Sequence, residues 1–322
     1  MNKDEIINKL KSLNIDKENN IINLESALVL NDFLDSADEI FLSCSNAYFD
    51  GLDLFTSDLF NKKDGNIIYS RDYYDSDYKI ISGYKVATLE SIYNILSSLK
   101  DKKYKKIIKD LDLELCLKDN YRYERKLREN GVSFIAGVDE VGRGPLVGPV
   151  VAACVVLPEH FNLDGLTDSK KLSEEKRNFF DKEIRKQALG YGIGVIDEKT
   201  IDDINIFEAT KLAMKDAIKD CLKMCKIEHI LIDAMPLNID IPTTSIIKGD
   251  IKSITISAAS VIAKVYRDSL LYELDKKYPM YDFKNNKGYP TKEHIDAINK
   301  YGIIPEHRKS YGPVKEYLEK NK

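Results

Sequence analysis

The stretch GVDEVGRGPLVGP, residues 137–149, places two adjacent acids, Asp139 and Glu140, directly after an apolar run and follows them with a glycine-rich turn. Neighbouring residues of a strand face opposite sides of a sheet, so both acids can serve one site only if the strand bends or ends immediately after Asp139. Gly142 and Gly144 make such a bend possible and let backbone groups approach a ligand closely. The stretch therefore predicts a buried strand that ends at a carboxylate site beside a ligand-binding turn.

Length and composition indicate a soluble globular protein. A chain of 322 residues with a formal net charge of -4 has room for two domains and no bias towards fibrous or disordered structure. The amino-terminal residues 1–13 carry charges and lack the apolar core of a signal peptide, and the longest apolar run, residues 150–157, is too short to span a bilayer. We therefore expect a cytoplasmic protein without membrane association, in which the five scattered cysteines are reduced structural thiols.

Residues 1–115 differ in character from the rest of the chain. They are acidic and rich in tyrosine, with strand-like runs over 39–45 and 78–87 and a helical pattern over 88–99 that Thr88 is suited to cap. These patterns predict a small α+β accessory domain, with a partly disordered segment as the alternative. No motif in this part carries chemistry, so its function is left open.

Residues 116–322 show strands followed by alternating helices and strands. A helix is expected over 120–131, ending at Gly131, and further helices over 205–224, 261–278 and 292–302. Strands are expected over 134–139, 150–157, 190–197, 229–234 and 253–260. This order favours an α/β domain in which helices pack on the faces of a mixed sheet.

Two more acids also follow apolar runs at presumed strand ends. Asp233 closes ILIDAMP (230–236), and Asp250 lies in IIKGDIKS (246–253), where we expect it just before another strand. A lone carboxylate at such a place is usually a turn former or a helix cap. If strands 134–139 and 229–234 are parallel neighbours, however, Asp139 and Asp233 share one spot and repel each other unless a cation lies between them. An all-oxygen ligand set suits Mg²⁺ or Mn²⁺.

Six motifs in unbroken order between Tyr121 and Tyr311 together carry a family resemblance. They are IAGVDEVGRGPLVGPVVAACVVLP, LTDSKKLSEEKR, LIDA, KGDIKSITISAASVIAKVYRD, NKGYPTKEH and HRKSY. With these motifs the chain resembles ribonuclease HII, the type 2 ribonuclease H. The resemblance implies a ribonuclease H-like mixed five-stranded sheet flanked by helices.

The resemblance also implies the chemistry and its residues. Asp139, Glu140, Asp233 and Asp250 would be the catalytic carboxylates and would hold two divalent ions, with Asp139 shared by both. The reaction implied is two-metal hydrolysis of the phosphodiester on the 5′ side of a ribonucleotide, leaving 5′-phosphate and 3′-hydroxyl ends. The substrates would be RNA:DNA hybrids and duplex DNA with a single embedded ribonucleotide. Asp268 competes for the fourth carboxylate position, but its place inside a helix favours a salt bridge.

Substrate recognition is implied for a second set of residues. In this family the Gly142, Arg143 and Gly144 element reads the ribonucleotide 2′-hydroxyl largely through backbone groups, and Tyr289 stacks on the deoxyribose that follows. Lys170 is a candidate phosphate contact. Two further cations, Lys264 and Arg267, are candidates for the same role, and the histidines of the last two motifs are expected to be structural.

Two alternatives stay open from the sequence. One is the relative ribonuclease HIII, which also has an amino-terminal extension but typically has another residue in place of Arg143. The other is a non-catalytic hybrid-binding subunit. The net charge of -4 lies entirely within residues 1–130, so the acidic extension should repel phosphates and could bind a protein partner instead. A nucleic acid would then be held by local cations, and a monomer is the default expectation.

Overall fold

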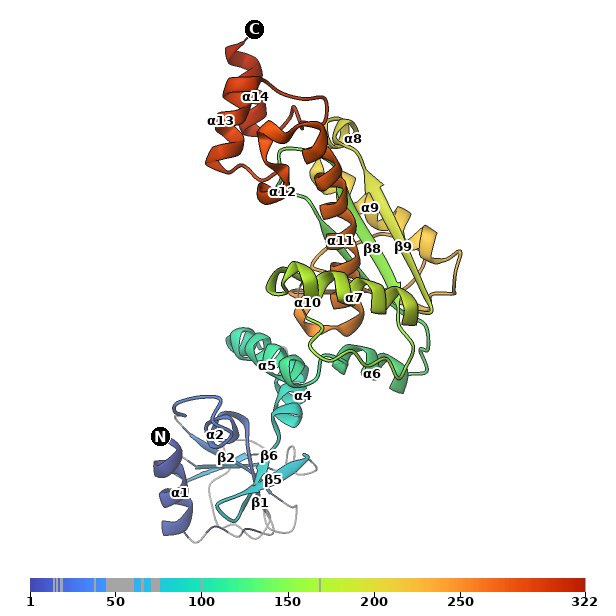
Figure 1. The fold of residues 1–322 in the computed structure, drawn as a ribbon. Coiled ribbons are helices and arrows are strands. Elements are labelled where there is room, and N and C mark those ends of the chain that lie inside the picture. Colours follow the sequence, from blue (N-terminus) through green and yellow to red (C-terminus); the bar gives the residue numbers. More distant parts are fainter. Residues whose placement is uncertain are drawn as a thin grey trace. The chain divides into compact units, whose positions relative to one another are not determined.

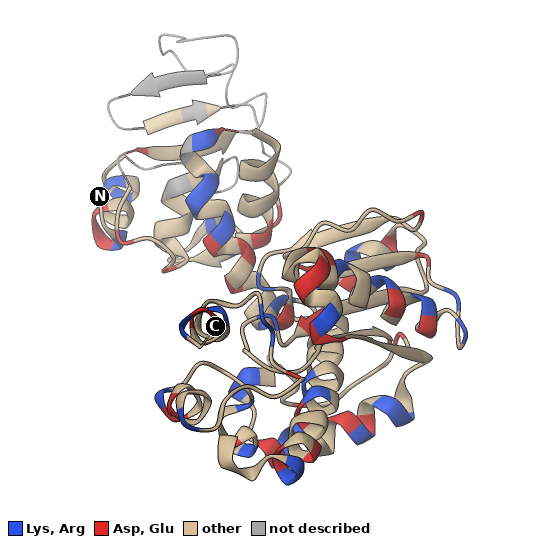
Figure 2. Ribbon diagram, turned by 90° about the horizontal axis from the view of Figure 1, so that it is seen from above, with Lys and Arg blue, Asp and Glu red and all other residues tan. Residues whose placement is uncertain are grey.

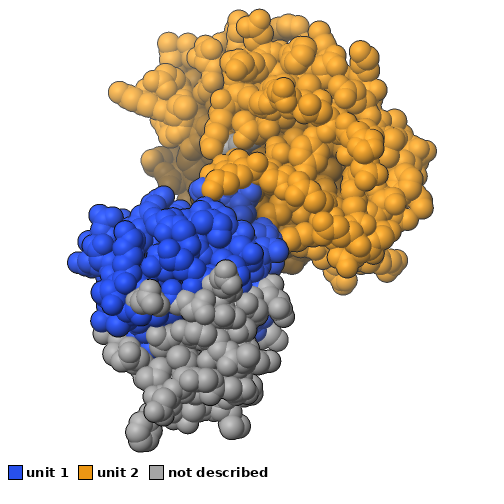
Figure 3. All heavy atoms as spheres, turned by 90° about the horizontal axis from the view of Figure 1, so that it is seen from below, with its two compact units in different colours: residues 1–115 blue, residues 116–322 orange. Residues whose placement is uncertain are grey.

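The computed structural model divides the chain into two compact units, Met1–Leu115 and Cys116–Lys322 (Figure 3). The structure describes all residues except 14, 16, 18, 19, 38, 45–60, 65, 66, 71–75, 100, 168 and 322. Ser45, in the strand expected over 39–45, and Asp168, in the second motif, lie outside the described residues.

The first unit has the expected α+β composition. Its sheet has the strand order β3-β4-β2-β1-β6-β5. The strands are β1 Asn20–Asn23, β2 Ile40–Cys44, β3 Asn61–Asp64, β4 Ile67–Ser70, β5 Tyr78–Ile81 and β6 Tyr84–Ala87. The helices are α1 Lys3–Ser12, α2 Leu24–Leu30, α4 Leu89–Leu99, the 3₁₀ turn η1 Lys102–Tyr104 and α5 Lys105–Lys118, which runs into the second unit. Thr88 caps α4 as expected, because its Oγ1 accepts the N–H of Ser91 at 3.2 Å.

The second unit contains the expected mixed five-stranded sheet. Its strands are β7 Ile135–Val141, β8 Val150–Val156, β9 Gly190–Ile196, β10 His229–Asp233 and β11 Thr243–Ile246, in the spatial order β11-β10-β7-β8-β9. β11, β10 and β7 are parallel, whereas β8 is antiparallel to both β7 and β9. The parallel pairing of β7 with β10 confirms the arrangement expected for the acid-bearing strands.

Helices cover both faces of this sheet (Figure 1). Helix α9 Ile206–Cys221 packs on one face, against alternate residues such as Val138 and Ile232. Helices α7 Glu174–Gln187 and α11 Ile254–Lys277 pack on the other face, against the intervening residues such as Val151. The remaining helices are α6 Arg122–Glu129, α8 Glu198–Ile204, α10 Gly249–Lys252, α12 Phe283–Asn286, α13 Lys292–Tyr301 and α14 Gly312–Lys320, with 3₁₀ turns η2 Ser169–Lys171 and η3 Pro279–Tyr281.

The strand expected over 253–260 is wrong, because these residues form the first turns of α11. The run SITISAAS alternates apolar and small polar residues, which is the pattern of a half-buried strand. In the structure all ten residues from Ile254 to Ala263 are buried, so no exposed face reveals the helical period of 3.6. Asp250 accordingly lies in the short helix α10, ahead of α11, and not before a strand.

Charge is mixed over the second unit. Figure 2 shows Lys and Arg interspersed with Asp and Glu along its helices, so cationic clusters are local. All five cysteines are free thiols, as expected. Within the described residues no helix has both the length and the apolar character needed to cross a membrane.

Candidate active site

Asp139 and Asp233 lie side by side at the carboxyl ends of neighbouring parallel strands. The register of β7 and β10 pairs Val138 with Ile232, so these two acids are the next facing positions. Val138 and Ile232 point to α9, and Asp139 and Asp233 therefore point to the α11 face. Ser260 of α11 donates a hydrogen bond to Asp139 there.

The other two carboxylates flank this pair but have partners of their own. Glu140 lies opposite Arg143 at 3.3 Å, and Asp250 lies 3.8 Å from the ammonium group of Lys170. Asp233 accepts the N–H of Gly249 at 2.7 Å, which holds the start of α10 against the end of β10. Throughout the described residues, no three His, Cys, Asp or Glu side chains are arranged to surround a metal ion.

The strand does not end immediately after Asp139. β7 pairs with β8 through Glu140 and Val141, so the strand continues past both acids, yet the Glu140 carboxylate is close enough to Asp139 and Asp233 for their charges to interact. Backbone hydrogen bonds to the antiparallel strand β8 extend β7 beyond the acids. The glycines of the turn had suggested an earlier end of the strand. Both carboxylates nevertheless stand at the same edge of the sheet.

Burial and mutual repulsion at this edge of the sheet disfavour negative charge on the carboxylates. Burial raises the pKa of Asp139 well above its ordinary value, and the charges of Glu140, Asp233 and Asp250 raise it further against the hydrogen bond from Ser260. Burial also raises the pKa of Glu140, although Arg143 opposes the shift. One carboxylate oxygen of Glu140, Oε2, is buried without a hydrogen-bond partner in the described structure. A buried, all-oxygen, mutually repelling set of this kind fits a hard divalent cation.

Two buried arginines hold the glycine turn that follows the acids. Arg308 donates to the carbonyl oxygens of Gly142 at 2.6 Å, Arg143 at 3.1 Å and Gly148 at 2.9 Å. Arg267 donates to the carbonyls of Val147, Pro149 and Lys287. Both side chains are fully buried. The phosphate contact expected for Arg267 is therefore wrong, because its guanidinium is buried and donates its hydrogen bonds to backbone carbonyls.

The arginines also fix which way the turn's peptide groups face. In a trans peptide the carbonyl and the following N–H point in opposite directions. Because the carbonyls of Gly142 and Arg143 point to Arg308, the N–H groups of Arg143 and Gly144 point away from it. Gly142 has φ +95°, and a Cβ there would lie 2.2 Å from Nε of Arg267, so no other residue fits.

Tyr289 lies against this turn. A Cβ placed on Gly144 would be 3.2 Å from Cε1 of the Tyr289 ring, and Tyr289 as a residue is 44% exposed. Leu146 N–H donates to the carbonyl of Gly288 at 2.7 Å, which ties the two segments together. The turn and the aromatic ring thus form one surface beside the carboxylates.

The remaining candidates fall into two groups. Lys170 stands next to Asp250 with its side chain 76% exposed, whereas Lys264 is paired with Asp268 at 2.8 Å. Asp268 is therefore a salt-bridge residue, and it is buried. The sequence did not reveal that Arg308 holds the carbonyls of the turn or that Ser260 hydrogen-bonds to Asp139. Both occur within quoted motifs, but no spacing signal links them to residues more than a hundred positions away.

A pair of buried histidines, His294 and His307, is hydrogen-bonded to the backbone of Tyr289. Ile304 N–H donates to Nδ1 of His307, so the proton of that ring is on Nε2. Nε2 of His307 lies 3.1 Å from Nε2 of His294, whose Nδ1 lies 2.9 Å from the Tyr289 carbonyl. The pair is thus a chain of hydrogen bonds in the neutral state, and its role is structural, as expected.

The histidine pair predicts a loss of stability in acid. Burial lowers the pKa of both rings, that of His307 to about 3 with the His294 charge as second cause. Between pH 3 and 6.5 the unfolded chain binds protons that the folded protein excludes, so the free energy of unfolding falls as the pH drops below 6.5. For His307 the slope should approach about 1.4 kcal/mol per pH unit, and His294 adds to it in the same direction.

Urea unfolding of the wild type and of His307→Asn between pH 7.5 and 4.5 measures this effect. Asparagine can still accept the Ile304 N–H but does not titrate, so the variant should be less stable at pH 7.5 and lose less stability in acid. Equal slopes for the two proteins would show that His307 is not the acid-sensitive group.

Known proteins match the second unit. The family model described as Ribonuclease HII matches residues 136–313. Ribonuclease HII of Bacillus cereus (strain G9842) is 55% identical over 216 residues, which cover 66% of this chain and 83% of the relative. Ribonuclease HII of Bacillus thuringiensis (strain Al Hakam) is 56% identical over 199 residues, 62% of this chain and 77% of the relative.

A solved structure gives the same result for the fold. Ribonuclease H2 from Pyrococcus horikoshii OT3 superposes with a TM-score of 0.51 at 26% identity, over 58% of this chain and 98% of that one. The likeness covers nearly the whole of that protein, so the part of this chain outside the match is an addition to the shared fold. These matches favour ribonuclease HII over ribonuclease HIII and over a non-catalytic subunit, and the chain belongs to the ribonuclease HII family of ribonuclease H hydrolases.

Proposed function

We propose that this ribonuclease H endonuclease cleaves RNA:DNA hybrids, and duplex DNA with single embedded ribonucleotides, on the 5′ side of a ribonucleotide. The products are 5′-phosphate and 3′-hydroxyl ends. The observation that carries the proposal is the pairing of Asp139 with Asp233 at adjacent strand ends, next to a turn that two buried arginines hold in place. This combination provides both a cation site and a rigid surface for a sugar.

The proposed cofactor is a pair of Mg²⁺ or Mn²⁺ ions, held by Asp139, Glu140, Asp233 and Asp250. Ions held by these residues would supply the chemistry of a two-metal site, namely a lower pKa for an attacking water and stabilisation of the charge on the departing 3′ oxygen. The repulsion among the buried acids and the unpartnered oxygen of Glu140 support this donor set. Ser260 holds the Asp139 carboxylate on the α11 face, and Gly249 holds Asp233.

Ribose recognition is assigned to the outward N–H groups of Arg143 and Gly144. Two adjacent donors can bind a 2′-hydroxyl oxygen, and a deoxyribose would leave them without a partner, which penalises the wrong sugar. Tyr289, which is partly exposed, would stack its ring on the neighbouring deoxyribose. Lys170, exposed beside Asp250, would contact a phosphate close to the scissile bond.

A matched pair of duplexes tests the proposal. With Mg²⁺ or Mn²⁺, the protein should cut a duplex carrying one ribonucleotide at the bond 5′ to it and leave the all-DNA duplex of the same sequence uncut, a preference of at least about 10⁴-fold. Denaturing electrophoresis locates the cut and end-labelling identifies its termini. Equal cutting of both duplexes would refute ribonucleotide sensing, and cutting without divalent ions would refute the metal assignment.

The amino-terminal unit is proposed to bind a protein partner, to orient the catalytic unit or only to stabilise it, without extending the nucleic-acid surface. Its negative charge disfavours phosphate contacts. Removing residues 1–104, which leaves α5 whole, should change the affinity for a hybrid less than about 3-fold. Fluorescence anisotropy measures the affinity, and circular dichroism verifies that the truncated protein is folded. A loss of 10-fold or more would show that the extension contacts the hybrid.

A further inference from the structure

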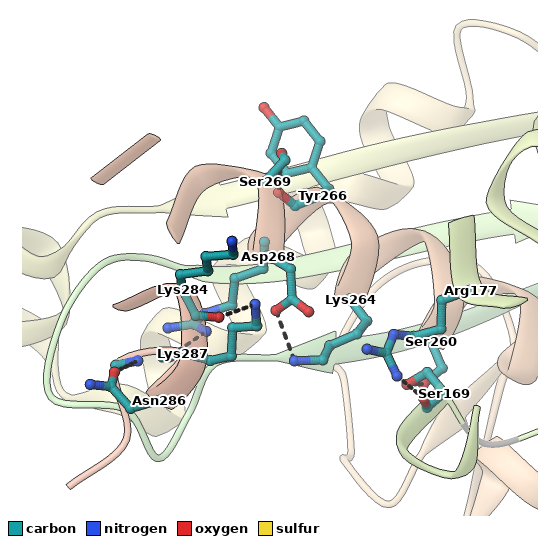
Figure 4. Close-up of polar contacts among 12 residues, drawn as sticks. Ser169, Arg177, Ser260, Lys264, Tyr266, Asp268, Ser269, Lys284, Asn286 and Lys287 are labelled. Atoms are coloured by element: carbon teal, nitrogen blue, oxygen red, sulfur yellow. Dashed lines mark hydrogen bonds and ion pairs between the residues drawn. The ribbon is translucent and has the colours of Figure 1, made fainter. Parts of the chain in front are cut away.

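Four cations gather beside the carboxylate site although no sequence motif groups them. Arg177 comes from α7, Lys264 from α11, and Lys284 and Lys287 from α12 and the residue that follows it. We call these four residues the basic cluster. Figure 4 shows Lys264, Lys284 and Lys287 close together around Asp268, with Arg177 further along towards Ser169 and Ser260.

Most side chains of the basic cluster are anchored. Lys287 Nζ donates to the carbonyl of Lys284 at 2.6 Å and lies 3.8 Å from the centre of the Tyr272 ring. Lys264 is paired with Asp268 at 2.8 Å, and Arg177 donates to the carbonyl of Ser169 at 3.1 Å. These contacts hold three of the four positive groups in place before any ligand arrives, which reduces the entropy lost on binding.

The positive charge of the basic cluster is only partly compensated. Asp268 and Glu174 are the carboxylates that interact with Lys287, against the like charges of Lys264 and Arg177. Burial first, and then these two cations, lower the pKa of Lys287. Asp275 is a third carboxylate nearby, because it accepts the Lys284 N–H at 3.1 Å, so the four cations keep an excess of about one positive charge, which attracts an anion.

Lys287 also occupies a backbone conformation that favours glycine. Its φ is 51°, and it caps the carboxyl end of α12, where glycine is the usual residue. The Arg267 guanidinium fixes its carbonyl at 3.1 Å. The backbone around Lys287 is therefore fixed, and its side chain starts from a defined position.

The basic cluster is continuous with the proposed active site. Ser169, whose carbonyl binds Arg177, lies 2.9 Å from Ser260, the residue that donates to Asp139. At its other end, Lys287 is two residues from Tyr289, which lies against the glycine turn. A nucleic-acid strand that reaches the carboxylates and Tyr289 therefore passes next to these cations.

We propose that the basic cluster binds a backbone phosphodiester of the substrate duplex, away from the scissile bond. The inference rests on the proposed function and adds a subsite to it. A phosphate contact of this kind positions the duplex without reading sequence or sugar. It should therefore contribute equally to binding hybrids and all-DNA duplexes, unlike the ribose-reading turn.

The test compares Lys284→Gln/Lys287→Gln with the wild-type full-length protein. The matched control is Lys215→Gln/Lys219→Gln, which removes two exposed lysines of α9, on the opposite face of the sheet. Affinity for a one-ribonucleotide duplex and for its all-DNA counterpart is measured by anisotropy in EDTA, so that no cleavage occurs, over a range of salt concentrations.

The cluster variant should bind both duplexes about 10-fold more weakly at low salt, and the slope of log Kd against log salt should fall by about 1 to 2. The control should lose less than about 2-fold. Unchanged affinity and slope in the cluster variant, or an equal loss in the control, would overturn the proposal. If the wild type failed to prefer cutting at the ribonucleotide, the proposed function would fail instead, and the salt slopes would still decide the subsite.

Neutral phosphates identify the contact directly. Single methylphosphonate linkages are placed one at a time along the duplex, and wild type and cluster variant are compared at each position. One or two positions should weaken the wild type and leave the cluster variant unaffected. If every position affects both proteins equally, the basic cluster contacts no phosphate.

Discussion

Replacing Asp139 with asparagine is expected to lower the rate of cleavage by at least about 10³-fold while preserving the fold. Asparagine keeps the shape of the side chain and can still accept the Ser260 hydroxyl, but it removes the charge on which the cation site depends. Asp233→Asn should act in the same way, since the two carboxylates face each other across β7 and β10.

The same substitution should make the protein more stable in the absence of divalent ions. The folded protein holds the Asp139 proton more tightly than the unfolded chain does, so ionising this group opposes folding, and the free energy of unfolding falls as the pH rises from the ordinary pKa of the group towards its raised pKa. Asp139→Asn should therefore melt a few degrees higher than the wild type in EDTA. Mg²⁺ should raise the melting temperature of the wild type and have little effect on the variant.

Asp181→Asn is the control for both measurements. Asp181 is also partly buried, pairs with Arg185 at 2.9 Å on α7, and has a pKa raised by burial. This variant should keep its activity and its response to Mg²⁺. Cleavage at the wild-type rate by Asp139→Asn would refute the assigned site, and a lower melting temperature in EDTA would refute the electrostatic argument.

Replacing Arg308 with methionine should cost both stability and discrimination between ribose and deoxyribose. The buried carbonyls of Gly142 and Gly148 lose their donor, whereas the carbonyl of Arg143 keeps the hydrogen bond from the Tyr311 hydroxyl. An unpaired buried group costs about 1–3 kcal/mol, so two such groups with partial relaxation bring the expected loss to roughly 2–5 kcal/mol. The peptide groups of the turn are then free to rotate, so its N–H groups no longer point outwards together.

The informative readout is the ratio of affinities, because a purely structural role would not change it. In EDTA, the wild type should bind the one-ribonucleotide duplex more tightly than the all-DNA duplex, and Arg308→Met should lose most of that preference. Arg308→Lys should recover only part of it, since one ammonium group cannot reach three carbonyls. Arg185→Met, which removes an arginine away from the turn, serves as control. A folded Arg308→Met protein with an unchanged ratio would show that the brace does not set specificity.

Several elements of the fold could be predicted because their sequence signals are local. The strands 134–139, 150–157 and 229–234 are apolar runs bounded by turns, and the structure has β7, β8 and β10 there. The helix over 205–224 has an exposed and a buried face, which its period reveals. The start of α11 has no exposed face, and for that reason the same method mistook it for a strand.

The sequence by itself determined the family, the carboxylate-bearing strand ends and the glycine turn, because these depend on residue type and short spacing. Only the tertiary structure decided that Asp139 and Asp233 share the α11 face and that the side chains of Arg267 and Arg308 hydrogen-bond to backbone carbonyls of the turn. It also decided that the basic cluster exists. Each of these depends on contacts between residues more than 90 positions apart in the chain or on separate elements. Such contacts are set by strand register and helix packing, which leave no periodic trace in the sequence.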